Sequence, residues 1–118
     1  MKILHLILKG KWYDMIVSGE KPEEYREIIP YWEKRLLNYS AIKADYQRLA
    51  MRKFLLGSAC RDVCAEYSRG YTHVCFHRGY TSTTTTYEYK GMTIGKGRPE
   101  WGAPEDKEVF IIKLGKRI

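Results

Sequence analysis

Three charged side chains that could act together lie within six residues near the start of the chain. Lys21, Glu24 and Arg26 follow Gly19, and the apolar pair Ile28-Ile29 comes after them. An ammonium group, a carboxylate and a guanidinium group this close together can pair with one another, bind an anion or a base edge, or transfer a proton. These residues are therefore the first candidates for a functional site.

Each kind of chemistry gives these residues different roles. In a structural role, Glu24 and Arg26 would form an ion pair, which contributes little free energy where solvent screens it. In a binding site, Lys21 and Arg26 would hold a phosphate or a base edge, and Glu24 would accept from an exocyclic amine. In a catalyst, Lys21 would be a nucleophile or base, which requires its amine without the extra proton.

Local rules predict how the chain presents these groups. Pro22 fixes its own φ and disfavours a helix at Lys21, so we expect a strand after it. Side chains of a strand alternate between two faces, which places Glu24 and Arg26 on the same face. Lys21 lies at the turn before the strand, where a bend could aim its amine at the same place.

Two elements are expected before this segment and one after it. Residues 2–9 are rich in Ile and Leu and predict a strand buried on both faces, with His5 as a core or barrel-lining residue. Apolar residues from Trp12 to Ile16 recur at helical spacing, and Trp12 is expected to fill the core. Pro30 is suited to begin a second helix over residues 30–37.

The segment Gly19-Glu20-Lys21-Pro22-Glu23-Glu24-Tyr25-Arg26 resembles the G-x-K-x-x-E-x-R signature of the ASCH domains, a branch of the PUA-like β-barrels. The resemblance extends over residues 2–36 and 71–117. It implies a mixed β-barrel with flanking helices, and by analogy with PUA domains it implies binding of RNA or nucleotides.

One branch of that family implies an enzyme instead. Small bacterial ASCH proteins hydrolyse the acetyl amide of N4-acetylcytidine with the motif lysine, a threonine three residues later and a glutamate from a later strand. Lys21 matches that lysine, but the position of the threonine is Glu24. By strand order, Glu88 is the nearest candidate for the later acid. The departure at residue 24 favours binding over hydrolysis.

The C-terminal half is expected to be mainly sheet. Strands are predicted over residues 71–78, 81–89 and 108–114, with residues 115–118 as a frayed end. Residues 91–102 between them are expected to form a loop. In it, Lys96 and Arg98 beside glycines could neutralise an anion, and Trp101 could stack on a base or cover the core.

Residues 38–70 are the part that least resembles the family. Their mixture of apolar and basic residues predicts a helical insertion packed on the barrel. We expect it to act as structural cover. A phosphate-contacting flank or a docking surface for an acidic partner is the alternative.

The cysteines bear on the location of the protein and on metal binding. Three cysteines, an odd number, and no recognisable leader predict reduced thiols and a cytoplasmic protein. Cys60 and Cys64 would share a face if helical, and Cys75 with His77 could complete a zinc site. Structural zinc sites usually have more closely spaced cysteine pairs, so we predict no metal and no cofactor.

The charge balance favours a polyanionic partner. The 118-residue chain has 21 Lys and Arg against 14 Asp and Glu, a formal net charge of +7. A basic surface attracts polyanions, and we favour RNA or a nucleotide. The length fits one domain, residues 1–118, and no apolar run is long enough to cross a membrane.

Together these observations predict an α+β PUA-like β-barrel that binds RNA or a modified nucleoside or nucleotide in a basic cleft. The residues expected to bind the ligand are Lys21, Glu24 and Arg26 at the floor, with Lys96, Arg98 and Trp101 above them. The alternatives are an amidohydrolase of acylated nucleosides, with Lys21 and Glu24 catalytic, and an accessory protein that binds an acidic partner through residues 38–70.

Overall fold

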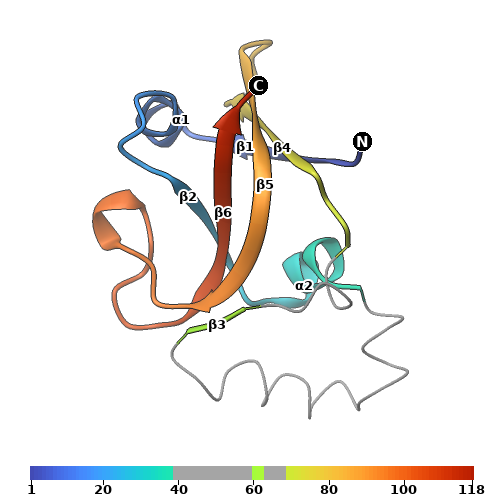
Figure 1. Cartoon of the computed structure of the whole chain (residues 1–118). Coiled ribbons are helices and arrows are strands. Elements are labelled where there is room, and N and C mark those ends of the chain that lie inside the picture. Colours follow the sequence, from blue (N-terminus) through green and yellow to red (C-terminus); the bar gives the residue numbers. More distant parts are fainter. Residues whose placement is uncertain (39–59, 63–68) are drawn as a thin grey trace.

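The computed structural model describes residues 1–38, 60–62 and 69–118, and it gives an α+β arrangement (Figure 1). The strands are β1 (Ile3–Leu8), β2 (Glu23–Glu27), β3 (Cys60–Asp62), β4 (His73–Arg78), β5 (Thr84–Gly95) and β6 (Val109–Arg117). The helices are α1 (Gly10–Val17), α2 (Pro30–Leu36) and the short 3₁₀ helix η2 (Pro99–Trp101).

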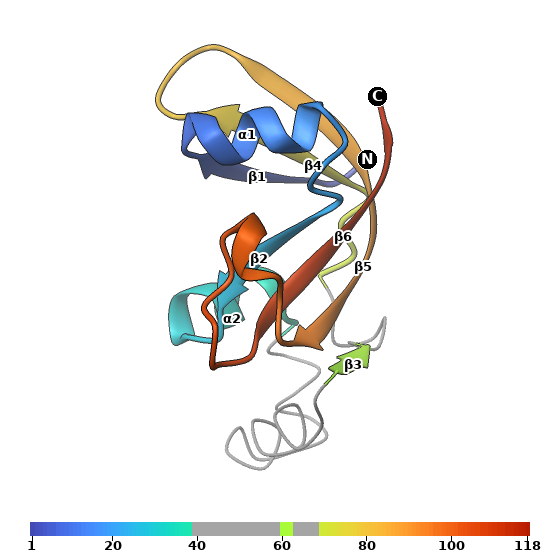
Figure 2. The same cartoon turned by 90° about the vertical axis from the view of Figure 1, so that its left-hand side faces the viewer.

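The sheet is mixed and curled into a half-barrel. Its strand order is β1-β4-β5-β6-β2, and β3 pairs with β5 off this path. The β1–β4 pair is parallel, and the other pairs are antiparallel. Figure 2 shows the curl, with α1 and α2 near opposite ends of its open side and the η2 segment between them. The two edge strands, β1 and β2, therefore lie on the open side, where the motif is.

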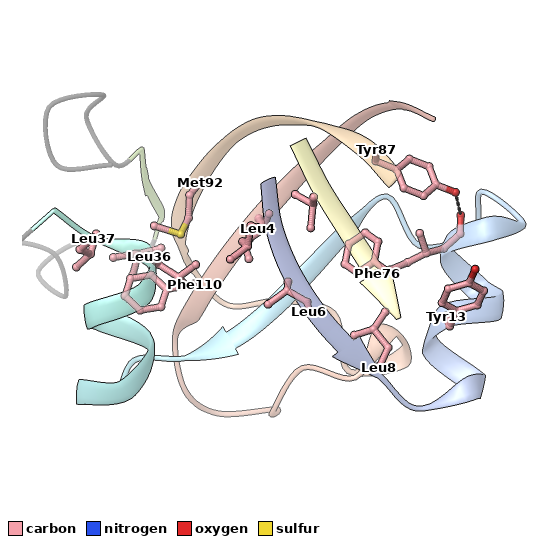
Figure 3. Packing of buried hydrophobic residues seen from close by; sticks show 14 residues of the cluster. Leu4, Leu6, Leu8, Tyr13, Leu36, Leu37, Phe76, Tyr87, Met92 and Phe110 are labelled. Atoms are coloured by element: carbon pink, nitrogen blue, oxygen red, sulfur yellow. Dashed lines mark hydrogen bonds between the residues drawn. The ribbon is translucent and has the colours of Figure 1, made fainter. Parts of the chain in front are cut away.

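The core fills the concave side of the sheet. Leu4, Leu6 and Leu8 alternate along β1 and pack with residues of β4, β5 and β6. Figure 3 shows this cluster extending from Leu36 and Leu37 at the C-terminal end of α2 to Tyr13 of α1. A second cluster contains Tyr25, Ala103, Val109 and Ile111, with Trp101 packed against it. The first of these clusters therefore holds both α1 and α2 to the sheet.

The prediction that β1 is buried on both faces was wrong. Its burial alternates, with Leu4, Leu6 and Leu8 buried but His5 and Ile7 exposed. His5 is therefore not a core residue. The reason is that the core packs on only one face of β1. Its outer backbone edge is partly covered by arginines: Arg35 donates to the His5 carbonyl (3.1 Å) and Arg26 to the Ile7 carbonyl (3.4 Å).

The last two strands are longer than predicted. β5 continues to Gly95 through residues expected to form a loop, with register shifts between Tyr87 and Met92 that mark an irregularity in the strand. β6 continues to Arg117, which pairs with Tyr87, so the expected frayed end is mostly strand. The two strands extend further because they pair with each other, and this pairing cannot be predicted from the local sequence of either strand.

Most of the predicted helical insertion lies outside the described residues. Within residues 38–70, the structure shows β3 at Cys60–Asp62, where a helix was expected, and pairs it with residues 93–95 of β5. Cys64 also lies outside the described part. No helix among the described residues is long and apolar enough to span a membrane.

The position of the core predicts the cost of truncating an aromatic side chain. Phe76 is 0% exposed in the main cluster, whereas Tyr80 in the neighbouring turn is 95% exposed. Phe76→Ala should lower the free energy of unfolding by about 3–5 kcal/mol, and Tyr80→Ala should change it by less than about 0.5 kcal/mol. Urea denaturation of both variants measures this, and similar losses would contradict the placement of Phe76.

Candidate functional site

The turn between α1 and β2 delivers Lys21 to the interior. Gly19 follows the helix with a φ of 85°, a left-handed conformation that glycine adopts without strain. The backbone N–H of Lys21 then donates to the carbonyl of Met15 (3.0 Å). The Lys21 side chain is only 2% exposed, which is unusual for lysine. A partner must therefore compensate for its lost hydration.

Glu24 is that partner, and it is buried as well, at 3% exposed. Lys21 Nζ donates to Glu24 Oε1 at 2.7 Å and to the carbonyl oxygen of Trp101 at 2.6 Å. Arg26 Nη1 lies 3.1 Å from Glu24 Oε2. The backbone N–H of Tyr25 also donates to Glu24 Oε1, at 2.9 Å. Three positively polarised groups thus surround one carboxylate, and the cluster as a whole has a surplus of one positive charge.

Aromatic rings enclose both cations. Lys21 Nζ lies 5.1 Å from the ring centroid of Trp12 and 5.1 Å from that of Tyr25. Arg26 Cζ lies 5.0 Å from the ring centroid of Trp32. Cations at these distances over a ring face are attracted by the ring quadrupole. The rings therefore stabilise both charges, and those of Trp12 and Tyr25 help to cover the buried Lys21.

The cluster lines a pocket of about 620 Å³ between β1, β2 and the η2 segment. Trp12, Trp32 and Trp101 come from three different elements and all line this pocket. Lys21, Glu24 and Arg26 line it with them. A cavity of this volume, with apolar rings and a few convergent polar groups, has the character of a small-molecule site.

Of the three loop residues predicted to bind the ligand, one lines the pocket and two do not. Trp101 lines the pocket, and its carbonyl oxygen accepts from Lys21. Lys96 and Arg98 are exposed and do not line it. Arg98 Cζ lies 4.7 Å from the centroid of the Trp101 ring. The loop comes close to β2 at Gly97, where an added Cβ would lie 2.6 Å from the Tyr25 ring.

Two tryptophans that line the pocket, Trp12 and Trp32, were not among the predicted site residues. Trp12 was expected only to fill the core, but it both packs against the core and lines the pocket. Trp32 was placed on a helix face without a role, and it lies beneath the Arg26 guanidinium. Their helical spacing shows that they face inward, but the curl of the sheet decides that this inward side includes a pocket.

Metal ligation does not suit this pocket. Its carboxylates are Glu24 and Glu27, and both oxygens of Glu24 already face cationic groups. Glu27 is paired with Lys107 at 3.5 Å on the surface. The described residues hold a group of possible ligands elsewhere, at His5, Cys75 and His77.

Tyr25 stiffens the floor of the pocket through its hydroxyl group. It donates to Glu23 Oε2 at 2.7 Å and accepts from the backbone N–H of Arg98 at 3.1 Å. Burial is the main reason that the pKa of Tyr25 is raised well above its usual value, and the neighbouring Glu23 carboxylate adds to this. The hydroxyl therefore keeps its proton and links β2 to the η2 segment.

The buried ion pair predicts a large cost for neutralising Glu24. Glu24→Gln leaves the buried Lys21 ammonium without a carboxylate, so the free energy of unfolding should fall by about 3–5 kcal/mol. Glu27→Gln, on the same strand but in an exposed pair, should cost less than about 1 kcal/mol. Denaturant titration of both variants tests this, and equal costs would show that the Lys21–Glu24 pair is effectively solvated.

The raised pKa of Tyr25 predicts a loss of stability at high pH. Above about pH 10 the unfolded chain loses this phenolic proton while the folded chain keeps it, so the free energy of unfolding falls as pH rises. Tyr25→Phe should make that fall shallower, and Tyr80→Phe, at an exposed position, should not. Unfolding curves between about pH 8 and 11 measure the difference. Identical slopes in Tyr25→Phe and the parent would contradict the assignment.

Comparison of the chain with protein-family models, with curated proteins and with solved structures finds no match. Inference about function therefore starts from the chemistry of the pocket.

Proposed function

We propose that this chain is an ASCH-type domain of the PUA-like superfamily that binds RNA, or a modified nucleoside or nucleotide, in the pocket around Lys21, Glu24 and Arg26. The observation that carries the proposal is the convergence of these three groups with three tryptophans on one pocket. The curled α+β half-barrel is compatible with that architecture. The G-x-K-x-x-E-x-R pattern supplies the link to the family.

The tryptophans support a planar ligand. Every nucleobase has a π-face, and stacking on aromatic side chains contributes about 1–3 kcal/mol per base. Trp12, Trp32 and Trp101 line the pocket from separate elements, so a base can enter between rings that the fold holds apart. A surplus positive charge favours a ligand that carries phosphate or electronegative ring atoms.

The hydrogen bonds divide the roles within the cluster. Glu24 accepts from Lys21 and from the Tyr25 N–H and forms an ion pair with Arg26, so it positions the two cations rather than contacting the ligand. Lys21 uses two of its three donors on Glu24 and Trp101. Arg26 is 15% exposed, and it donates through Nη1 to the Tyr25 carbonyl (2.7 Å) and through Nη2 to the Ile7 carbonyl (3.4 Å). Its Nε–H and second Nη2 hydrogen are left for a base edge or a phosphate. Arg26 is therefore the main ligand contact in this proposal.

The exposed cations beside the pocket fit a longer ligand. Lys96 and Arg98 lie outside the pocket lining, next to the η2 segment that carries Trp101. On an RNA strand whose base occupied the pocket, they would face neighbouring phosphates. We assign them to the sequence-independent part of binding.

Amidohydrolysis is the less favoured alternative. Glu24 occupies the position of the threonine that the hydrolase branch uses, and it holds Lys21 in a charged pair. Glu88, the candidate for the later acid, accepts from the backbone N–H of Lys116 and does not line the pocket. Absence of acetate release from N4-acetylcytidine by the purified chain is the result we expect.

Binding is tested by two variants, each of which removes one positive charge, one inside the pocket and one outside it. Arg26→Gln should weaken binding of a short single-stranded RNA or of a modified nucleoside by about 10–100-fold, because a charged hydrogen-bond partner is lost. Lys113→Gln removes one positive charge from an exposed position of β6 and should weaken binding by less than about threefold. Quenching of tryptophan fluorescence measures both, and RNA affinity should fall steeply with salt.

The folded state of each variant is checked by its thermal unfolding midpoint. Trp12→Leu serves as a second pocket variant, because it removes a stacking surface without removing charge. Equal weakening by Arg26→Gln and Lys113→Gln, with no effect of Trp12→Leu, would show that RNA binds the basic surface rather than the pocket. No binding of RNA or of any nucleoside by the parent would overturn the proposal.

A further inference from the structure

A second group of reactive side chains lies on the outer face of the sheet. His5 of β1 pairs in parallel register with Cys75 of β4, and His77 follows two residues later on the same face as Cys75. The opposite faces of both strands, with Leu4, Leu6, Val74 and Phe76, belong to the core. The three side chains are thus held on two paired strands, which fixes their backbone positions.

Their ligand atoms converge. His5 Nδ1 lies 3.0 Å from His77 Nε2, and Cys75 Sγ lies 3.8 Å from the same Nε2. All three ligand atoms lie within 4.8 Å of one another. Cys75 is a free thiol on the same face of the sheet as the two imidazoles, and it is only 8% exposed. Two ring nitrogens and a sulfur that face one another can share a proton or can share a metal ion.

We propose that His5, Cys75 and His77 form a zinc site with three protein ligands and an open fourth position. Zinc takes imidazole nitrogen at about 2.0–2.1 Å and thiolate sulfur at about 2.3 Å in tetrahedral geometry, which places nitrogens about 3.3 Å apart and nitrogen and sulfur about 3.6 Å apart. The observed 3.0 and 3.8 Å are close to these separations. The third separation, between His5 Nδ1 and Cys75 Sγ, is no more than 4.8 Å. His5 is exposed, so its ring can rotate to bring Nδ1 closer to Cys75 Sγ without disturbing the core.

The donor set and its surroundings indicate which metal and which fourth ligand. Imidazole and thiolate together suit zinc, and three protein ligands with one open position are typical of zinc sites that bind water or substrate. His5 and His77 line a pocket of about 420 Å³ together with Arg26 and Arg35. Those guanidinium groups favour an anion, such as hydroxide or a carboxylate, at the open position.

This site differs from the zinc hypothesis based on sequence. That hypothesis combined Cys60 and Cys64 with Cys75 and His77, whereas the third protein ligand here is His5. The site is also separate from the Lys21–Glu24 cluster and does not depend on binding of RNA. The two pockets share Arg26 and Trp32 in their linings, so a metal would lie beside the proposed nucleoside pocket.

Cobalt titration of the metal-free chain, prepared without a histidine tag, tests the proposal. Co²⁺ is a spectroscopic substitute for Zn²⁺, and a thiolate ligand gives an intense charge-transfer band in the near ultraviolet. We expect that band at one equivalent and its loss when one equivalent of Zn²⁺ is added. Cys75→Ser should abolish it, and His5→Ala or His77→Ala should weaken cobalt affinity at least about tenfold.

Matched controls distinguish the site from other ligands in the chain. His73→Ala removes a histidine from the same face of β4 outside the group, and Cys60→Ser with Cys64→Ser removes the other thiols. Both controls should keep the band. Its persistence in Cys75→Ser, or its loss only in the Cys60/Cys64 variant, would overturn the proposal.

Thermal unfolding supplies a second readout. A saturating excess of Zn²⁺ should raise the unfolding midpoint of the parent by at least about 5 °C, because the ion binds the folded state. His5→Ala is expected to fold, since His5 is exposed, and to show no such rise. The absence of a rise in the parent, or an equal rise in His5→Ala, would count against the site.

Discussion

The structure depends on a buried ammonium group at Lys21. Taking such a group out of water costs several kcal/mol unless a charge of opposite sign and further acceptors are in place. Glu24 supplies the charge, and the Trp101 carbonyl supplies the second acceptor. Because Lys21 and Trp101 are eighty residues apart in sequence, this one side chain ties the turn after α1 to the segment between β5 and β6. The pocket exists because these segments are held together there.

The curl of the sheet explains why the reactive groups gather at its open side. β1 and β2 are the two ends of the strand order, and Arg26 of β2 donates to a carbonyl of β1. Edge strands leave unpaired backbone groups that proteins must cover. Here Arg26 and Arg35 partly cover them; Arg26 lines both pockets, and Arg35 lines the one that contains His5 and His77. Closing the sheet edge and shaping a binding surface are therefore tasks of the same side chains.

Local rules were sufficient for the elements around the motif. Pro22 immediately precedes β2, and Pro30 is the first residue of α2, a position that suits the fixed φ of proline. The alternation of side chains within β4 sets Cys75 and His77 on one face. The same rules failed at β1, because an apolar run does not reveal whether one face or both faces of a strand will be covered. They also failed at the end of β5, where pairing with β3 and β6 outweighs a glycine-rich sequence.

By itself the sequence determined the charged motif, the order of strands and helices around it, the basic character of the chain and an α+β architecture. It did so because proline, glycine and apolar periodicity act over a few residues. Only the tertiary structure decided that Lys21 is buried against Trp101, that Trp12 and Trp32 face the same pocket, that Lys96 and Arg98 do not, and that His5 meets Cys75 and His77. Those outcomes depend on which strands become neighbours when the sheet curls, and no short stretch of sequence encodes that.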